Sequence, residues 1–237
     1  MSASAGRPRL AGRPPLAAVL AAALVAIGVA ATDSASRVVG AGCLGQPATI
    51  VGTAGDDQLT GTSKDDVIDG GAGDDRIRGA GGSDVICGGE GDDTLNADGG
   101  PGNLIDGGAG DDTLVGGSGI DVLDGGAGDD TLRGAGGRDV VSYTNARGAV
   151  DVDLARGRAT GSGADRLIGI ESVLGSRFND VLTGDAGRNR LAGLAGNDRL
   201  NGLAGNDLVD GGPGNDTLDG GPGADFCLRG ERSVHCP

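Results

Sequence analysis

A nine-residue phrase repeated head to tail is the feature that most constrains how this chain can fold. One copy reads Gly-Gly-Ala-Gly-Asp-Asp-Arg-Ile-Arg from Gly70 to Arg78, and variants of it fill most of the 237 residues. A fixed short period predicts a solenoid, in which every unit adopts the same local structure and stacks on its neighbours. With Gly52 as position 1, further units begin at Gly61, Gly70, Gly79, Gly88, Gly107, Gly116, Gly125 and Gly134 and, in a second array, at Gly175, Gly184, Gly193, Gly202, Gly211 and Gly220.

The composition of each unit predicts a tight turn followed by a short strand. Glycines at positions 1, 2 and 4 allow positive φ and close approach of the backbone. Position 8 is a branched aliphatic residue between more polar neighbours, as in a half-buried strand. Each unit is then half a coil, and two units complete a coil. The expected core residues are Leu59, Ile68, Ile77, Ile86, Leu95, Leu114, Leu123, Leu132, Val141, Leu182, Leu191, Leu200, Val209 and Leu218.

Position 6 is nearly always aspartate. In stacked coils, position 6 of alternate units lies along one edge, with coils about 4.8 Å apart. The stacked position 6 side chains thus form a ladder along each edge, in which each side chain is one rung. Two carboxylates at about 5 Å repel by about 3 kcal/mol at an effective dielectric near 20, so the ladder needs positive charge between its rungs. Carboxylate and carbonyl oxygens are the ligands that calcium prefers. The predicted metal ligands are Asp57, Asp66, Asp75, Asp84, Asp93, Asp112, Asp121, Asp130, Asp139, Asp180, Asp198, Asp207, Asp216 and Asp225.

The spacing assigns these aspartates to separate edges of the solenoid. In the first array, Asp57, Asp75, Asp93, Asp112 and Asp130 are expected on one edge, and Asp66, Asp84, Asp121 and Asp139 on the other. In the second array, Asp180, Asp198 and Asp216 share one edge, and Asp207 and Asp225 the other. One residue inserted near Ala97 is expected to be absorbed within its unit. There Asn103 occupies position 6, as Asn189 does later, and each neutral side chain predicts a weak rung.

These units resemble the RTX, or haemolysin-type, calcium-binding repeat, whose consensus is G-G-x-G-x-D-x-U-x. The resemblance implies an all-β fold, a right-handed parallel β-roll or β-helix solenoid of nonapeptide repeats. It also implies multiple Ca²⁺ ions, each held between the turns of units n and n+2 by the position 6 aspartates and backbone carbonyls. Folding is then expected to be coupled to calcium binding.

Residues 143–174, between the two arrays, do not follow the nine-residue repeat. Val150, Val152 and Leu154 alternate with aspartates, which predicts a half-buried strand. Inserts of the form S-Y-x-N-A…V-x-V-x-L…I-E-S-V-x-G-S interrupt RTX arrays in secreted bacterial proteins, so the resemblance makes this segment part of the same module. Its strands are expected to extend the solenoid or to cap one array against the next. The interruption, with the neutral side chain at Asn189, predicts that residues 143–191 open at a lower free energy than the first array.

Residues 1–31 predict a secretory signal peptide. Three arginines precede an apolar run from Leu16 to Ala31, which ends on small residues suited to cleavage. The alternative is a membrane anchor, but this run is short for a span of roughly 20 residues. Cleavage would leave the protein with no stable membrane insertion and place it outside the cell, secreted or extracellular.

Four cysteines fit an oxidising compartment. Of the three pairings that can be drawn, Cys43 with Cys87 and Cys227 with Cys236 is favoured, because each bond would tie down an end of the solenoid. The rival is a zinc site from Cys227, His235 and Cys236, with only three ligands. The expected organisation is a signal peptide at 1–31, a lead-in or cap at 32–51, the first array at 52–142, the insert at 143–174, the second array at 175–228 and a disulfide-tied tail at 229–237.

Composition excludes several classes of function. The chain has 31 Asp and three Glu, so its acidity follows the repeat. A formal charge of −15, or −18 once three leader arginines are removed, excludes ordinary nucleic-acid binding. The chain has only three aromatic residues, which argues against an aromatic-lined pocket. Neither H-E-x-x-H, G-x-S-x-G nor a P-loop occurs. Neighbouring carboxylates such as Asp74 and Asp75 should point to opposite faces, so the chain is predicted not to be an enzyme.

Two functions stay open at this stage. The first is a structural or interaction protein of the cell exterior, with an unknown protein or cell-surface partner. The second is a non-catalytic calcium-binding accessory module, related to RTX proteases, lipases or epimerases but without their catalytic domain. An ice-binding or adhesive face would need a flat row of threonines or aromatics, whereas the outward positions 7 and 9 are mixed. Asp124, at outward position 9, is expected to contribute little.

Overall fold

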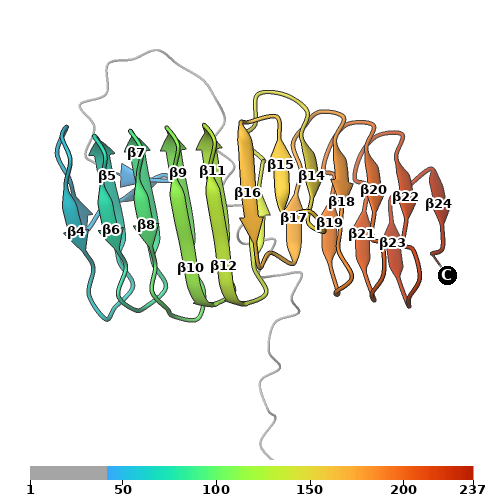
Figure 1. Cartoon of the computed structure of the whole chain (residues 1–237), viewed down its shortest axis with the longest axis horizontal. Helices are drawn as coiled ribbons and strands as arrows, with labels where there is room; N and C mark the ends of the chain where they lie inside the picture. The colour runs from blue at the N-terminus through green and yellow to red at the C-terminus, as the bar shows by residue number, and fades with distance from the viewer. Residues whose placement is uncertain (1–41, 237) are drawn as a thin grey trace, which may run out of the picture. The chain divides into compact units, whose positions relative to one another are not determined.

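Short strands stacked in two layers make up the computed structural model, which describes residues 42–236 (Figure 1). Every regular element in this part of the chain is a strand. Successive nonapeptides place their strands alternately in one layer and the other, so each coil contributes one strand to each sheet. The predicted fold, an all-β solenoid of stacked parallel coils, is confirmed.

The two sheets run the length of the solenoid. The larger sheet contains, in spatial order, β4 (Gln58–Thr60), β6 (Arg76–Arg78), β8 (Thr94–Asn96), β10 (Thr113–Gly119), β12 (Thr131–Gly137), β16 (Ala164–Ile168), β15 (Arg158–Thr160), β14 (Asp151–Asp153), β18 (Val181–Thr183), β20 (Arg199–Asn201), β22 (Thr217–Asp219) and β24 (Arg232–Val234). The smaller contains β3 (Ile50–Val51), β5 (Val67–Ala72), β7 (Val85–Glu90), β9 (Leu104–Ala109), β11 (Val122–Ala127), β13 (Val140–Ser142), β17 (Ser172–Leu174), β19 (Arg190–Ala192), β21 (Leu208–Asp210) and β23 (Phe226–Leu228). A separate hairpin pairs β1 (Gly42–Cys43) with β2 (Gln46–Pro47).

The repeat length sets the register of both sheets. Ile68 on β5 lies opposite Ile86 on β7, one coil of eighteen residues later. Ile86 in turn lies opposite Ile105, nineteen residues later, because the extra residue near Ala97 is taken up in one turn. Strand pairing continues in register beyond the insertion, so the aliphatic residues of every later coil still face inward.

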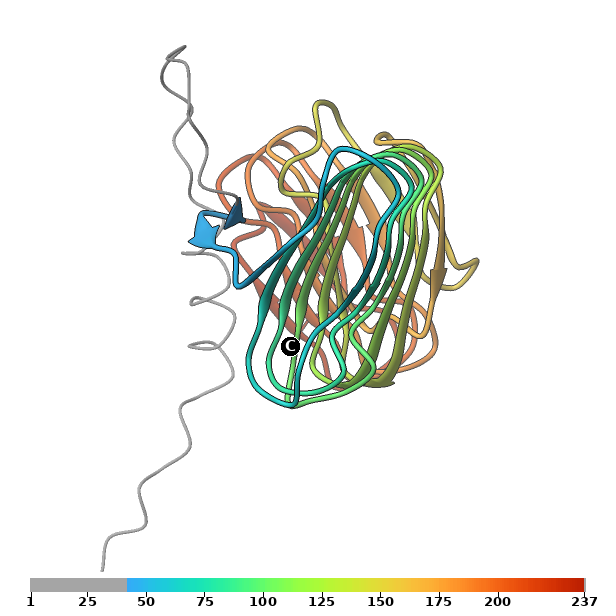
Figure 2. The same cartoon turned by 90° about the vertical axis from the view of Figure 1, so that its left-hand side faces the viewer.

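The core is a narrow file of aliphatic side chains between the two sheets, which face each other in the end view (Figure 2). Position 8 residues from both sheets fill it, and all are fully buried except Leu59 of the first coil and Cys227 of the last, which are partly buried. Alternation along each short strand turns their neighbours outward. The core is therefore one side chain deep on each sheet. A large share of the residues lies in the turns that connect the two sheets.

The insert carries both sheets from the first array to the second. In the larger sheet, β16 pairs parallel to β12, β15 runs antiparallel between β16 and β14, and β14 pairs parallel to β18. In the smaller sheet, β17 joins β13 directly to β19. Val150, Val152, Ala159, Leu167, Ile170 and Val173 are all buried in the common core. The insert is thus a packed part of the solenoid.

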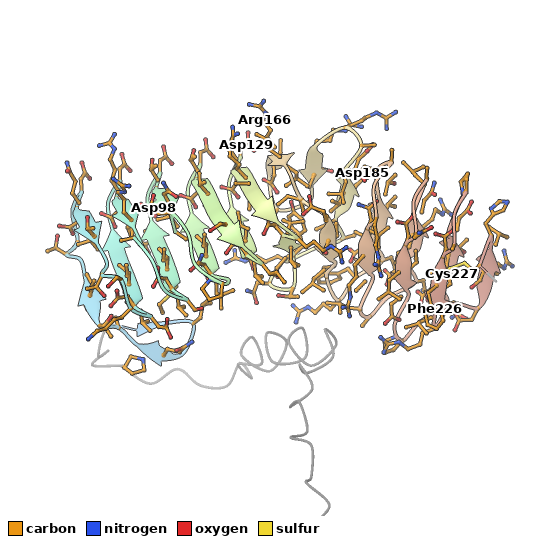
Figure 3. All side chains as sticks on the ribbon, turned by 90° about the horizontal axis from the view of Figure 1, so that it is seen from below. Asp98, Asp129, Arg166, Asp185, Phe226 and Cys227 are labelled. Carbon is orange, nitrogen blue, oxygen red and sulfur yellow. A yellow bond between two sulfur atoms is a disulfide. The ribbon has the colours of Figure 1, made fainter. Side chains whose placement is uncertain are left out.

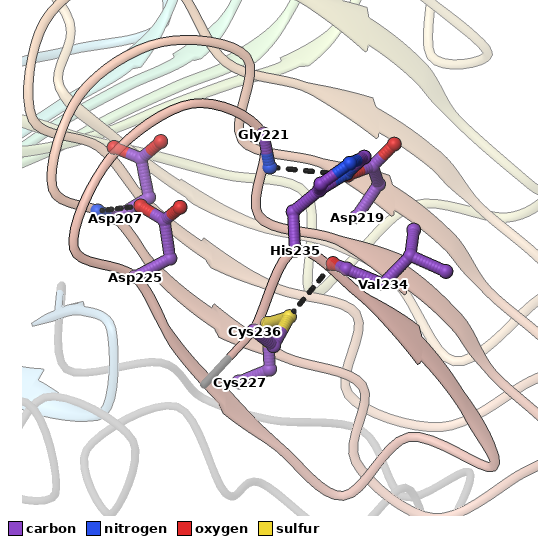
Figure 4. Close-up of a disulfide and its surroundings, with 8 residues drawn as sticks. All are labelled: Asp207, Asp219, Gly221, Asp225, Cys227, Val234, His235 and Cys236. Carbon is purple, nitrogen blue, oxygen red and sulfur yellow. Dashed lines mark hydrogen bonds and ion pairs between the residues drawn. A yellow bond between two sulfur atoms is a disulfide. The ribbon is translucent and has the colours of Figure 1, made fainter.

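Two disulfides lie near the ends of the described region. Cys43 on β1 bonds to Cys87 on β7, with Cα atoms 5.6 Å apart, and Cys227 bonds to Cys236 (Figure 4). The favoured cysteine pairing is confirmed. The zinc alternative is wrong, because both of its thiols are consumed in the second bond. His235 is exposed, with its Nδ1 2.8 Å from Asp219 Oδ1.

The predicted signal peptide and half of the lead-in at 32–51 lie outside the described residues. Within residues 42–236, no helix has the length and apolar character needed to cross a membrane.

Candidate functional site

The position 6 aspartates line the two edges of the solenoid, where turns connect the sheets. Each interior carboxylate uses Oδ1 to accept a backbone hydrogen bond from the coil before it. The N–H of Asp57 donates to Asp75 Oδ1 at 2.8 Å, and the N–H of Asp75 donates to Asp93 Oδ1 at 2.8 Å. The structure brings these residues together in the order 57, 75, 93, 112, 130 on one edge and 66, 84, 103, 121, 139 on the other. In the second array the same contact links 180, 198 and 216, and 189, 207 and 225.

The other oxygen of most of these carboxylates has no partner. Among the described residues, eleven position 6 aspartates bury Oδ2 without any hydrogen bond. A buried charged oxygen is costly unless it is paired, so each one indicates a missing cation or donor. These residues are Asp75, Asp84, Asp93, Asp112, Asp121, Asp130, Asp139, Asp198, Asp207, Asp216 and Asp225.

The glycine at position 1 explains how each Oδ2 can reach the next coil. A Cβ atom on Gly70 would collide with Asp75 Oδ2 and with the carbonyl oxygen of Gly88, one coil later. Gly88 repeats this arrangement with Asp93 Oδ2 and the carbonyl oxygen of Gly107. Gly107 repeats it with Asp112 Oδ2 and the carbonyl oxygen of Gly125. Carboxylate and carbonyl oxygens of successive coils therefore border the same glycine. Calcium binds through hard oxygen donors of these two kinds.

Backbone groups have to supply part of any metal site here. Within residues 42–236, no three acidic, histidine or cysteine side chains gather closely enough to hold one ion. The residues present fit calcium as a ladder of shared sites, in which position 6 carboxylates and turn carbonyls would be the ligands. Bound calcium would supply the positive charge that the unpaired oxygens lack.

Burial perturbs the acidity of the interior rungs. It raises the pKa of Asp112 and Asp130 to about 7, and that of Asp93, Asp139 and Asp198 to about 6. Neighbouring carboxylates on the same edge raise these values further. Asp66, in the first coil, shows the opposite behaviour. A hydrogen bond from the Thr62 backbone lowers the pKa of Asp66, against the smaller effect of burial.

Three acidic residues outside the repeats also occupy rungs of the ladders. Asp165 Oδ1 accepts the N–H of Asp130 at 3.2 Å, and Glu171 Oε2 accepts that of Asp139 at 2.8 Å. Glu231 Oε2 accepts the N–H of Asp216 at the C-terminal end. The repeat pattern missed them, although the scarcity of glutamate was a usable signal, since two of the three in the chain stand here.

The two asparagine rungs turn a donor toward the ladder. Asn103 Nδ2 donates to Asp121 Oδ1 at 2.9 Å, and Asn189 Nδ2 donates to the carbonyl oxygen of Glu171 at 3.5 Å. An N–H group at these positions repels a cation, whereas a carboxylate oxygen attracts one. This agrees with the prediction that both rungs are weak.

A second, exposed ladder runs beside the first on one edge. The N–H of Asp74 donates to Asp56 Oδ1 and that of Asp92 to Asp74 Oδ1, and the series continues through Asp111 to Asp129. Figure 3 labels its last member, Asp129. Asp74 thus accepts from the following coil, while Asp75 accepts from the preceding one. Asp75 is buried, whereas Asp74 is exposed, so the two neighbouring carboxylates have different surroundings.

Asp124 is more enclosed than its outward position suggested. It borders a pocket of about 350 Å³ together with Asp106, Asn145 and Arg147. Asn145 Nδ2 donates to Asp124 Oδ2 at 3.2 Å. Burial, with Asp106 alongside, raises the pKa of Asp124 to about 7. Residues of the loop after β13 line this pocket. The expectation that Asp124 contributes little to calcium binding stays a prediction.

Comparison with known families agrees with the site geometry. The model of the RTX calcium-binding nonapeptide repeat matches residues 51–86, 76–103, 106–141, 168–200 and 193–227, which together span more than half of the chain. No curated protein is significantly similar to the chain in sequence. With its stacked coils, its position 6 ladders and these matches, the chain belongs to the RTX calcium-binding nonapeptide repeat family.

Proposed function

We propose that this protein is a secreted calcium-binding β-roll whose folding is coupled to calcium, and that it serves as a structural or interaction protein of the cell exterior. The eleven buried, unpartnered Oδ2 atoms carry this proposal. In the absence of cations each is a desolvated charge beside others of the same sign. Calcium removes both penalties at once, so binding energy becomes folding energy.

Two further features support a role outside the cell. Both pairs of cysteines form disulfides, which persist in oxidising compartments. The N-terminal residues carry the pattern of a secretory leader. Extracellular calcium sites usually bind in the range of about 0.1 to 1 mM, which suits a protein that folds after export.

Circular dichroism in chelator and in calcium tests this function. The chain in chelator should lose most of its β signal and regain it cooperatively at about 0.1 to 1 mM calcium. Magnesium should substitute poorly, because it demands a smaller octahedral site and dehydrates reluctantly. Equal β content and equal heat stability with and without chelator would contradict the proposal.

A further inference from the structure

The turns of the solenoid adopt two conformations, which differ at position 2. In most units this residue has positive φ, such as Gly71 at 107° and Gly89 at 125°. Ala80 and Leu194 accept the same strained conformation, at 77° and 75°. In these open turns, the position 6 aspartate of the same unit keeps a free Oδ2.

Three units have a closed turn instead, with Thr or Ser at position 2 and negative φ. Asp57 Oδ2 accepts the N–H of Thr53 at 2.6 Å and its hydroxyl at 2.9 Å. Asp66 Oδ2 accepts the N–H of Thr62 at 2.7 Å and its hydroxyl at 2.8 Å.

The third closed turn follows the insert. Asp180 Oδ2 accepts the N–H of Ser176, and Asp180 Oδ1 accepts the Ser176 hydroxyl at 2.7 Å. These carboxylates are satisfied by their own turns.

A fourth turn closes in a similar way around a neutral side chain. The N–H of Asp185, at position 2, donates to Asn189 Oδ1 at 2.7 Å. The four closed turns are the first two units of each array, one on each edge. Every unpartnered Oδ2 in the described residues belongs to a later unit of its array.

From this pattern we infer that the residue at position 2 decides whether a rung binds calcium. The N–H groups of Thr53, Thr62 and Ser176, together with the hydroxyls of the two threonines, occupy the Oδ2 atom that a cation would use. The leading coil of each array is then a calcium-independent cap, on which the calcium-binding coils stack. This inference rests on the proposed function and specifies which rungs perform it.

The physical basis is competition for one oxygen atom. A carboxylate that already accepts an N–H and an O–H has part of its charge neutralised and its lone pairs occupied. An ion at that rung would have to displace both donors. A glycine at position 2 lacks the hydroxyl and can take the positive φ that turns its N–H away.

Counting bound calcium in the full chain tests the inference. Thr62→Gly and Ser176→Gly should each open one turn and add about one ion, measured by equilibrium dialysis and calorimetry. The unaltered chain should bind no more ions than its eleven free Oδ2 atoms. Thr62→Ser retains a hydroxyl and should bind the same number as the unaltered chain.

Ser118→Gly provides a matched control, because Ser118 is exposed at position 3 of its unit and donates no hydrogen bond to a carboxylate among the described residues. It should leave the number of ions unchanged. Equal numbers in the unaltered chain and in both position 2 glycine variants would overturn this inference while the proposed function stands. Absence of calcium binding in the unaltered chain would overturn both.

Discussion

At the scale of single residues, each position 6 aspartate divides its two oxygens between different partners. Oδ1 joins coils through a backbone N–H, and in open turns Oδ2 is buried and free. The same side chain therefore holds the stack together and gives it a charge that has to be neutralised. Protons and calcium ions are alternative ways to do so.

Acid should partly replace calcium. The folded-state pKa values of about 6 to 7 for Asp93, Asp112 and Asp130 lie above the ordinary aspartate value. Without calcium, the folded chain then binds more protons than the unfolded chain, so stability falls as pH rises through 6 to 7. Far-ultraviolet circular dichroism of calcium-free protein should show more β structure at pH 5 than at pH 8. A β signal that instead increases over this range would contradict the raised pKa values.

Removing one interior carboxylate should weaken two neighbouring sites. Asp75→Ala deletes the free Oδ2 and the Oδ1 that accepts the N–H of Asp57. Loss of such a charged ligand costs about 1.5 to 3 kcal/mol, so calcium should bind the affected sites roughly tenfold or more weakly, and the calcium midpoint for folding should rise. Asp151→Ala, on an exposed position of β14, serves as the control and should leave the midpoint unchanged. Similar shifts in the two variants would mean that Asp75 acts only through net charge.

At the scale of elements, the insert acts as a bridge. Tyr143 is buried, and its hydroxyl donates to Asp165 Oδ2 at 2.9 Å. The equivalent Oδ2 atom has no partner in the open turns. Between Asp139 and Asp198, the described residues contain no buried carboxylate oxygen without a partner. The centre of the solenoid is therefore held by an apolar core and by protein hydrogen bonds.

From this packing we expect the opposite order of local stability from the one predicted from sequence. At limiting calcium, amides of residues 150–183 should exchange more slowly than those of residues 107–139, where four rungs depend on a cation. Hydrogen exchange followed by mass spectrometry measures the two segments in one sample. Faster exchange in the insert would instead support the prediction that residues 143–191 open at a lower free energy than the first array.

At the scale of the whole molecule, the charge is concentrated in the first array. Residues 52–142 contain twenty acidic and five basic residues, whereas residues 175–236 contain nine acidic and six basic residues. The second array carries asparagine where the exposed ladder of the first carries aspartate, as at Asn197 and Asn215. Calcium dependence should thus be stronger in the first array.

Monovalent salt should not replace calcium. Screening at 0.5 M acts weakly on these carboxylates because they are buried, and salt screens buried charges much less than exposed ones. Sodium chloride at this concentration should restore only a small part of the β signal in chelator, compared with full recovery in 5 mM calcium. Complete folding in salt alone would show that the ladders need general screening and no bound ion.

The nonapeptide period by itself determined the β-solenoid, its core residues and the alignment of the aspartates on two edges. A strict local repeat can pack in very few ways, since each unit contacts only its neighbours. The cysteine pairing also followed from where the ends of the solenoid had to lie.

Only the tertiary structure decided which carboxylates are satisfied and which are free. Thr53 and Ser176 close their turns, and Tyr143 reaches Asp165 across 22 residues. Glu171 and Glu231 enter the ladders from segments without the repeat. These contacts depend on where chain folding places groups that share no period, and a periodic pattern carries no information about residues that break it.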